Sequence, residues 1–435
     1  MRNWARGANS LDSLNASNYS VPMRRMLLMA IGVWAVASAQ AGRDWPQFRG
    51  PLGNGHSDAK GIPLKFDDST NVKWKTKVTG QGWSSPVIYK DQVWMQTSLD
   101  GGRSLRVLCY DKHTGQKIHG LEVFYVPQPA KINKANSHAS PTPVVEEGRC
   151  YVFFGMYGVA AIDTKTGKIL WKNTSLKHDH DDNGAGSSPI IYRDKLILNC
   201  DGTELRYVAA VYKQTGKLAW RANRSNDMSD INFHLRKAYH TPEIIKVDGR
   251  DQLVSMGAQR VNGYDPNTGE ELWYVDIPGF SNVPRPVYGH GLVYLATGYM
   301  KPQMWAIDPR GQGNITSSGV KWRVIRQAPA KPSPILVDDI FYMVSDGGIL
   351  TALEAKTGKE IYQERLRGKF SASPVYVGGH IYFSDETGKV SVVKPGREFN
   401  VVAQNKFPAG FMASPAFSEN AMYLRTKTHL YRIEK

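Results

Sequence analysis

Histidine and carboxylate side chains alternate in one short stretch of this chain, His178-Asp-His-Asp-Asp-Asn183. Imidazole and carboxylate together are ligand types that Zn²⁺ and other transition metals take in proteins. His178, His180, Asp181 and Asp182 are therefore candidate metal ligands. The stretch lacks the spacing of a known metal motif, and Asp-rich loops without the glycine of a calcium loop are usually solvated. A solvated loop stays the alternative.

A second group of polar side chains is suited to holding a ligand. Cations among them could fix an anion, and pairing with neighbouring carboxylates is the competing explanation. The candidate ligand-binding residues are His138, Arg236, Lys237, His240 and Arg285.

Recognised catalytic motifs are missing from the sequence. It has no Gly-x-Ser-x-Gly elbow, no His-Glu-x-x-His pair and no phosphate-binding glycine loop ahead of a helix. Carboxylate pairs such as Asp67-Asp68 and Asp338-Asp339 lie in predicted turns, where solvation explains them more simply than glycosidase chemistry. We therefore assign no catalytic residue.

Internal repetition indicates the elements that must position these side chains. A proline opens each unit, and successive prolines lie 40 to 57 residues apart. An apolar run, a polar turn and a second apolar run with an aromatic residue follow most of them. The eight prolines are Pro86, Pro143, Pro189, Pro242, Pro286, Pro334, Pro374 and Pro415.

Each unit continues with a third strand, a turn such as Asp-Thr-Lys-Thr-Gly-Lys at 163–168, and a fourth strand that carries a Trp in most units. An acidic residue that opens such a turn accepts backbone N–H groups, and Gly takes the position with positive φ. Four short strands in about 45 residues, without a helical period, are typical of a propeller blade. The structural blade tryptophans are Trp74, Trp171, Trp220, Trp273 and Trp322.

The repeat predicts an all-β fold, an eight-bladed β-propeller of four-stranded antiparallel blades. Because the last unit ends after three strands, we expect the Trp-bearing segment 72–78 to close blade eight. The propeller domain then spans residues 72–435, after a leader at 42–71. Loops that join a fourth strand to the next first strand share one face, and three consecutive ones are long, at about 124–140, 174–187 and 222–241. This loop-rich face is where we expect binding.

The N-terminus resembles an export signal. Met23-Arg24-Arg25, an apolar stretch and the small-residue site Ala39-Gln-Ala41 predict a cleaved signal peptide at 23–41, with Met23 as the start of translation and residues 1–22 as an extension. The apolar stretch is too short for a transmembrane anchor, so we expect no membrane span in the mature chain. The expected location is the periplasm or the exterior. Cys109, Cys150 and Cys200 allow at most one disulfide.

The basic charge does not indicate nucleic-acid binding. Residues 1–41 hold four basic and one acidic residue, which leaves 51 basic and 38 acidic residues, a net charge of +13. The excess would suit an anionic surface or polymer. The lysines are scattered through turns, however, and no zinc finger, helix-turn-helix or RNP signature is present.

Several of these motifs resemble those of PQQ-like propeller proteins, related to the quinoprotein alcohol dehydrogenases. The resemblance rests on Ser-Ser-Pro-Val openings, Ala-Ile-Asp-Thr-Lys-Thr-Gly-Lys-Ile-Leu-Trp at 161–171 and the blade tryptophans, and it covers about residues 44–435. The leader Asp44-Trp-Pro-Gln-Phe-Arg-Gly-Pro51 is similar to that of exported planctomycete propellers. The resemblance implies either an enzyme using pyrroloquinoline quinone (PQQ) with calcium or a scaffold for outer-membrane assembly.

Dehydrogenases of this type carry a vicinal disulfide above the quinone and a Glu-Asn-Asp calcium set, and neither is recognised here. We therefore expect no cofactor, with PQQ and calcium as the alternative. The leading interpretation is a monomeric, exported, non-catalytic scaffold that binds a protein, polysaccharide or small ligand through its loop-rich face. A divergent PQQ-dependent dehydrogenase and an outer-membrane assembly scaffold are the alternatives.

Overall fold

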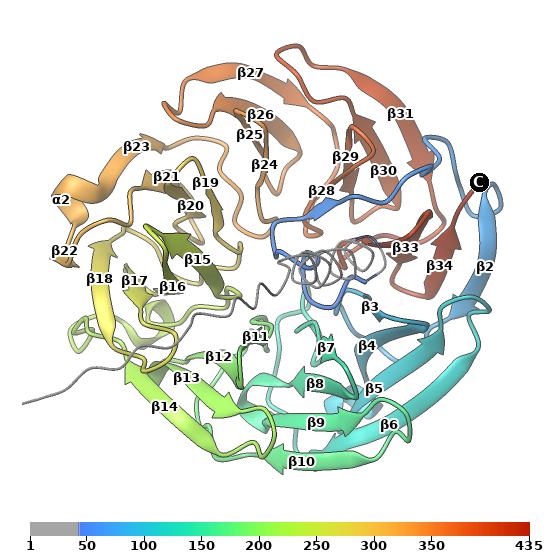
Figure 1. Ribbon diagram of the computed structural model, residues 1–435, viewed down its shortest axis with the longest axis horizontal. Coiled ribbons are helices and arrows are strands. Elements are labelled where there is room, and N and C mark those ends of the chain that lie inside the picture. The colour runs from blue at the N-terminus through green and yellow to red at the C-terminus, as the bar shows by residue number, and fades with distance from the viewer. Residues whose placement is uncertain (1–41, 43) are drawn as a thin grey trace, which may run out of the picture. The chain divides into compact units, whose positions relative to one another are not determined.

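The computed structural model describes Gly42 and residues 44–435, and these residues form eight sheets arranged in a ring around an axis (Figure 1). Each sheet is built on four antiparallel strands, which follow chain order from the axis outward in seven of the eight sheets. The predicted eight-bladed all-β propeller is confirmed. The predicted signal at 23–41 lies outside the described residues.

The first four blades follow one another along the chain. Blade 1 contains β3 (Val87–Tyr89), β4 (Gln92–Leu99), β5 (Ser104–Asp111) and β6 (Lys117–Tyr125). Blade 2 contains β7 (Val144–Glu146), β8 (Arg149–Phe153), β9 (Val159–Asp163) and β10 (Ile169–Asn173). Blade 3 contains β11 (Ile190–Tyr192), β12 (Lys195–Asp201), β13 (Arg206–Tyr212) and β14 (Leu218–Asn223). Blade 4 contains β15 (Glu243–Val247), β16 (Arg250–Gly257), β17 (Arg260–Tyr264) and β18 (Glu271–Asp276).

The next three blades repeat the pattern, with one insertion. Blade 5 contains β19 (Val287–Gly289), β20 (Leu292–Ala296), β21 (Met304–Ile307) and β23 (Val320–Val324). Its insertion holds β22 (Gly313–Asn314), which adds to blade 4, and helix α2 (Thr316–Gly319). Blade 6 contains β24 (Ile335–Val337), β25 (Ile340–Val344), β26 (Ile349–Glu354) and β27 (Glu360–Arg365). Blade 7 contains β28 (Val375–Val377), β29 (His380–Ser384), β30 (Lys389–Val393) and β31 (Val401–Lys406).

Blade eight joins the two ends of the described chain. It contains β32 (Ala416–Ser418), β33 (Ala421–Arg425), β34 (His429–Ile433) and, as its outer strand, β2 (Val72–Lys77). Strand β2 pairs antiparallel with β34, with Trp74 opposite Arg432 and Lys77 opposite His429. The predicted closure by segment 72–78 is therefore confirmed. Closure of this kind covers the edge of β34.

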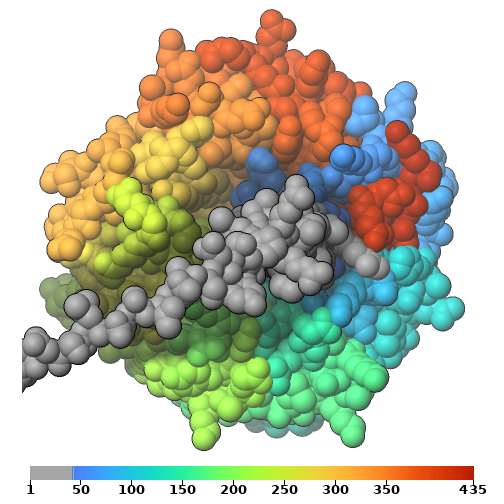
Figure 2. All heavy atoms as spheres, viewed as in Figure 1, coloured from blue at the N-terminus to red at the C-terminus, as the bar shows by residue number. Residues whose placement is uncertain are grey.

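The second and third strands of each blade are buried on both faces and form the apolar layers between blades. Strand β33, for example, is buried at every position, whereas the outer strand β2 alternates half-buried and exposed residues. The space-filling view shows the blades packed side by side around the ring (Figure 2). No helix within the described residues has the length and hydropathy to cross a bilayer.

Four of the five blade tryptophans dock onto the next blade. The Trp171 indole donates to the Lys213 carbonyl at 3.0 Å, and Gly216 in the same turn lies under the indole ring. Trp74, Trp220 and Trp322 make the same contact with the turns at Gly115, Gly269 and Gly358. Trp273 instead bonds Gln252 within its own blade, because blade 5 has its insertion where the turn would be. The turn and the tryptophan of the repeat are thus one inter-blade joint.

Substitution at this joint should be costly. A Cβ on Gly216 would lie 2.4 Å from Trp171, and its φ of 69° is left-handed. We expect Gly216→Ala to lower the free energy of unfolding by about 2–4 kcal/mol, from backbone strain and overpacking. Urea denaturation of both proteins measures the loss. The control is Gly148→Ala, whose φ is 73° with open space around the Cβ, and we expect about 1 kcal/mol there. Equal losses would contradict the joint.

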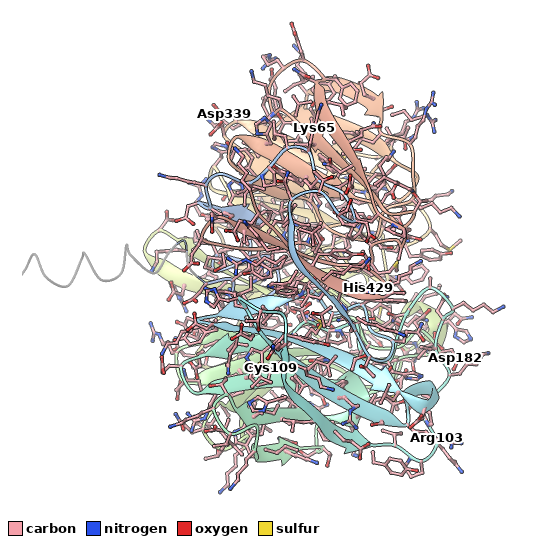
Figure 3. All side chains as sticks on the ribbon, turned by 90° about the vertical axis from the view of Figure 1, so that its right-hand side faces the viewer. Lys65, Arg103, Cys109, Asp182, Asp339 and His429 are labelled. Carbon is pink, nitrogen blue, oxygen red and sulfur yellow. The ribbon has the colours of Figure 1, made fainter. Side chains whose placement is uncertain are left out.

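The predicted leader lies against the inner strands. Trp45 forms a β-bridge with Ile88 of blade 1, and β1 (His56–Ser57) pairs in parallel with β28 of blade 7. Between them the leader crosses the centre of the ring (Figure 1). The two faces of the disc differ. Asp182 and Arg103, in loops after fourth and second strands, lie on one face, and Asp339, in a turn after a first strand, lies on the other (Figure 3).

Candidate functional site

A ring of hydroxyl groups surrounds the axis on the loop-rich face. The residue before each of the eight prolines is Ser or Thr in seven blades and Arg285 in blade 5. Each hydroxyl accepts a backbone N–H from the corresponding residue of the preceding blade, at 2.9 or 3.0 Å. The hydroxyl acceptors are Ser85, Thr142, Ser188, Thr241, Ser333, Ser373 and Ser414.

Arg285 takes the eighth position of the ring. Its guanidinium is paired within the protein and is not free to bind an anion. Its Nε lies 2.5 Å from the Glu243 carboxylate, and its Nη1 donates to the Phe48 carbonyl at 2.7 Å. Burial raises the pKa of Glu243, although Arg285 opposes the shift. The sequence left two roles open for Arg285, anion binding or pairing with a carboxylate. In the structure it pairs with the Glu243 carboxylate.

The leader crosses the axis next to this ring (Figure 1). The buried Arg49 guanidinium donates to the carbonyls of Asn54 and Pro334 at 2.8 and 2.7 Å, and more distantly to three others. Burial, helped by the nearby charge of Arg285, lowers the pKa of Arg49 to about 9. Gly53 approaches Arg285 so closely that a Cβ there would lie 2.5 Å from the guanidinium. These contacts hold the leader across the axis.

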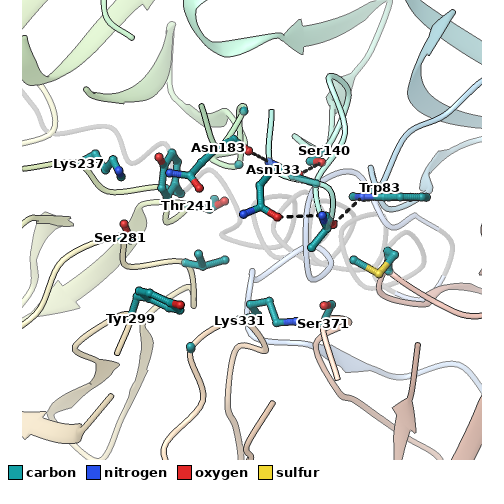
Figure 4. Close-up of a pocket in the computed structure, with 18 of the residues that line it drawn as sticks. Trp83, Asn133, Ser140, Asn183, Lys237, Thr241, Ser281, Tyr299, Lys331 and Ser371 are labelled. Atoms are coloured by element: carbon teal, nitrogen blue, oxygen red, sulfur yellow. Dashed lines mark hydrogen bonds between the residues drawn. The ribbon is translucent and has the colours of Figure 1, made fainter. Parts of the chain in front are cut away.

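A pocket of about 730 Å³ opens above the ring and the leader, within the size range of small-ligand sites (Figure 4). Its walls come from the three long loops predicted from the repeat and from loops of blades 5 to 8. All seven ring hydroxyl residues line it. Its aromatic lining residues are Phe48, Trp83, Tyr239, Phe280 and Tyr299, and its amide residues are Asn133, Asn136 and Asn183.

The charged side chains of the pocket wall are paired with one another. Lys237 contacts the Asp181 carboxylate, which also lies 2.7 Å from His234. Lys331 lies 3.6 Å from Asp346 and 3.0 Å from Glu386, a neighbour outside the lining. Burial lowers the pKa of Lys237. Two lysines and two aspartates thus balance within the pocket.

The structure separates the four candidate metal ligands. The ring centroids of the half-buried His178 and the buried His180 lie 5.2 Å apart. Asp181 instead pairs with Lys237, and the exposed Asp182 lies 3.3 Å from Lys131. The His180 Nε2 accepts the Met156 N–H, so that nitrogen is occupied. No group of three or more His, Cys, Asp or Glu side chains is arranged for a metal among the described residues.

Most of the candidate ligand-binding residues lie outside the axial pocket, and Lys237 alone of them lines it. His138 lines a small void with His180, and burial lowers the pKa of both rings. His240 is fully buried and accepts the Met256 N–H at 2.8 Å, and burial lowers its pKa as well. Arg236 donates to carbonyls of its own loop.

Apart from Arg285, the residues that precede the eight prolines belong to the repeat but were not among the predicted site residues. The hydroxyl residue before seven of the prolines was the available signal, because a side chain repeated at one position of a propeller repeats around its axis. Nothing local in the leader predicts that Phe48 and Arg49 reach the axis.

The donor set does not fit a calcium-bound quinone. Calcium takes about six to eight oxygen ligands, often carboxylates, and both aspartates of the pocket are paired with its lysines. The tricarboxylate of the quinone needs cations. The two lysines that line the pocket, Lys237 and Lys331, are already paired with its aspartates. Cys109, Cys150 and Cys200 are free and buried, and burial raises the pKa of each thiol. These thiols do not supply a disulfide above a quinone.

Comparison with known proteins places the chain among PQQ-like propellers. A family model described as outer membrane protein assembly factor BamB matches residues 64–197, 120–236 and 205–435. The BamB protein of Legionella pneumophila is 24% identical over 44% of this chain and 49% of its own length. The quinoprotein ethanol dehydrogenase of Pseudomonas aeruginosa is 27% identical over 55% of this chain and 40% of its own length. The chain therefore matches half or less of the length of these relatives.

Solved structures agree on the fold. A europium-containing methanol dehydrogenase superimposes with a TM-score of 0.67 at 10% identity, covering 92% of this chain and 100% of that one. At this sequence identity, the similarity shows only that the two proteins share a fold. Because the family model matches most of the propeller, this chain is a PQQ-like β-propeller that belongs to the family described as outer membrane protein assembly factor BamB.

Proposed function

We propose that this chain is an exported, non-catalytic propeller scaffold that binds its ligand in the axial pocket of the loop-rich face. The periplasm or the exterior is its proposed location, in line with the outer-membrane name of the family. Deep pockets with convergent polar groups are the usual ligand sites of a fold, and this one draws on most of the blades.

One observation carries the proposal: each charged group in the pocket is neutralised within the protein. An acid or base catalyst needs a group whose proton is free to move at the working pH. Asp181 is held by Lys237 and His234, and Asp346 lies beside Lys331 and accepts two backbone N–H groups. A pocket of paired charges, hydroxyls and aromatic rings supports binding without chemistry.

The experiment distinguishes a binding scaffold from a quinone-dependent enzyme. The purified chain is melted alone and with PQQ plus Ca²⁺, and dye-linked alcohol oxidation is assayed in parallel. A ligand at a hundredfold excess over its Kd would raise the free energy of unfolding by about 2.7 kcal/mol. We expect no shift and no dye reduction. Dye reduction that depends on PQQ would overturn the proposal in favour of a dehydrogenase.

An outer-membrane assembly scaffold is the second candidate, favoured by the family match and by apolar side chains on the loop-rich face. Phe233, Tyr299 and Met300 are 49%, 61% and 71% exposed, and the last two line the pocket. Exposed apolar patches commonly mark protein contacts. This role predicts co-purification with outer-membrane assembly proteins of the native host, lost in Phe233→Ala/Met300→Ala. Co-purification that the double variant leaves unchanged would count against it.

A further inference from the structure

The hydroxyl ring has hydrogen-bond donors left over. Each of the seven hydroxyls accepts one backbone N–H, and within the described residues none of them donates a hydrogen bond to the protein. Each of these residues is less than 5% exposed, and each lines the pocket. A buried hydroxyl retains one O–H donor and a second lone pair. The seven unused O–H donors therefore face the pocket, where a ligand can accept hydrogen bonds from them.

The floor and walls add aromatic surface to these donors. Phe48 lines the pocket from the leader, and Trp83 and Tyr239 line it from the loops. The Trp83 indole donates to the Ala135 carbonyl at 3.1 Å, and the Tyr239 hydroxyl donates to the His180 carbonyl at 2.9 Å. Because their polar atoms are used inside the protein, these two side chains have only their rings to offer a ligand.

Amide groups at the mouth supply further donors. The Asn133 Oδ1 accepts the Ala135 N–H at 2.9 Å, and its Nδ2 donates to no protein atom among the described residues. Asn136 is used differently, because its Nδ2 donates to the Asn183 and Ala185 carbonyls and ties two long loops together. Asn136 thus fixes the wall, whereas the amide N–H groups of Asn133, labelled in Figure 4, are left for a ligand.

The chemistry of the pocket selects among ligand classes. A strongly charged ligand would have to compete with the Lys237–Asp181 pair and with the carboxylates beside Lys331. An extended peptide could pair with the ring hydroxyls through its N–H and C=O groups, but its backbone has no apolar face to pack on the aromatic rings of the pocket. A sugar presents hydroxyl oxygens that accept hydrogen bonds around its edge and C–H faces that pack on aromatic rings. That combination matches a ring of O–H donors with aromatic surface.

We propose that the axial pocket binds units of a neutral saccharide, with sugar hydroxyls on the Ser/Thr ring and sugar faces on the aromatic side chains. This inference rests on the proposed function and names the ligand class of the same site. Phe48 belongs to the leader, so the leader supplies part of the saccharide site.

The experiment is calorimetric titration of the purified chain with neutral hexasaccharides of glucose, mannose, xylose, galactose and N-acetylglucosamine. An acidic oligogalacturonate and a set of extended peptides serve as the contrasting probes. The variants are Tyr299→Ala and Asn133→Ala, both at exposed positions of the pocket lining. The matched control is Tyr212→Ala, 43% exposed and outside the pocket lining. Melting curves establish that the three variants are folded.

We expect at least one neutral saccharide to bind, with affinity falling by about tenfold or more in Tyr299→Ala and Asn133→Ala and staying unchanged in Tyr212→Ala. Failure of every neutral saccharide to bind, or binding that both pocket variants leave unchanged, overturns the inference. Pocket-dependent binding of a peptide or of the oligogalacturonate alone overturns the saccharide class and leaves the proposed binding function in place. PQQ-dependent dye reduction overturns the proposed function itself.

Discussion

Replacing residues 72–78 with a Gly/Ser linker of equal length should abolish the cooperative fold. The replacement keeps the leader connected to blade 1 and removes β2, which pairs with β34 from Val72 to Lys77. It also removes Trp74, which docks onto the Lys112 carbonyl of blade 1. We expect a loss of more than roughly 5 kcal/mol, comparable to the total stability of many domains. The uncovered β34 edge should also template aggregation.

Soluble yield, size-exclusion chromatography and thermal melting by circular dichroism measure the effect. The control is Lys73→Ala/Lys77→Ala, which changes two exposed positions of β2 and leaves its pairing intact. It should melt close to the parent protein. A soluble, monomeric linker variant with a cooperative melt near that of the parent would refute closure by β2.

Asp201→Asn should be the most destabilising single substitution away from the ring closure. The Asp201 carboxylate and the Arg224 guanidinium lie 2.5 Å apart with no exposed side-chain surface. Burial alone lowers the pKa of Arg224, but the Asp201 and Tyr264 contacts outweigh it and raise the pKa overall. Removing the carboxylate leaves a buried, uncompensated cation. We expect the free energy of unfolding to fall by about 3–5 kcal/mol.

A double-mutant cycle with Arg224→Met isolates the pair. Urea denaturation of the two single variants and the double variant should give a coupling energy of about 2 kcal/mol or more. The matched control is the cycle of Asp265→Asn and Arg250→Met, because that pair lies 3.1 Å apart with the arginine half exposed. Its coupling should stay under about 1 kcal/mol. Additive losses at the Asp201–Arg224 pair would contradict a strong buried ion pair.

The candidate site was predictable in position and only slightly in content. Loop lengths predicted which face carries the pocket, because all connections from a fourth to a first strand share one face of a propeller. Of the candidate ligand-binding residues, Lys237 lines the pocket, Arg285 pairs with Glu243, His138 lines a separate small void, and His240 accepts the Met256 N–H. The sequence around a histidine in a long loop does not show whether its side chain points into the core or into a pocket. The direction of the side chain depends on which residues pack around it, and this packing is set by the tertiary structure.

The sequence by itself determined the blade count, the closing strand, the tryptophan positions and the face that carries the long loops. These follow from periodicity, because each unit repeats the same apolar spacing and the same turn. Only the tertiary structure decided that seven hydroxyls form one ring and that Arg49 holds the leader against the inner loops. It also split the candidate metal ligands between the interior and the surface. The physical reason is the ring itself, which brings residues hundreds of positions apart to one axis.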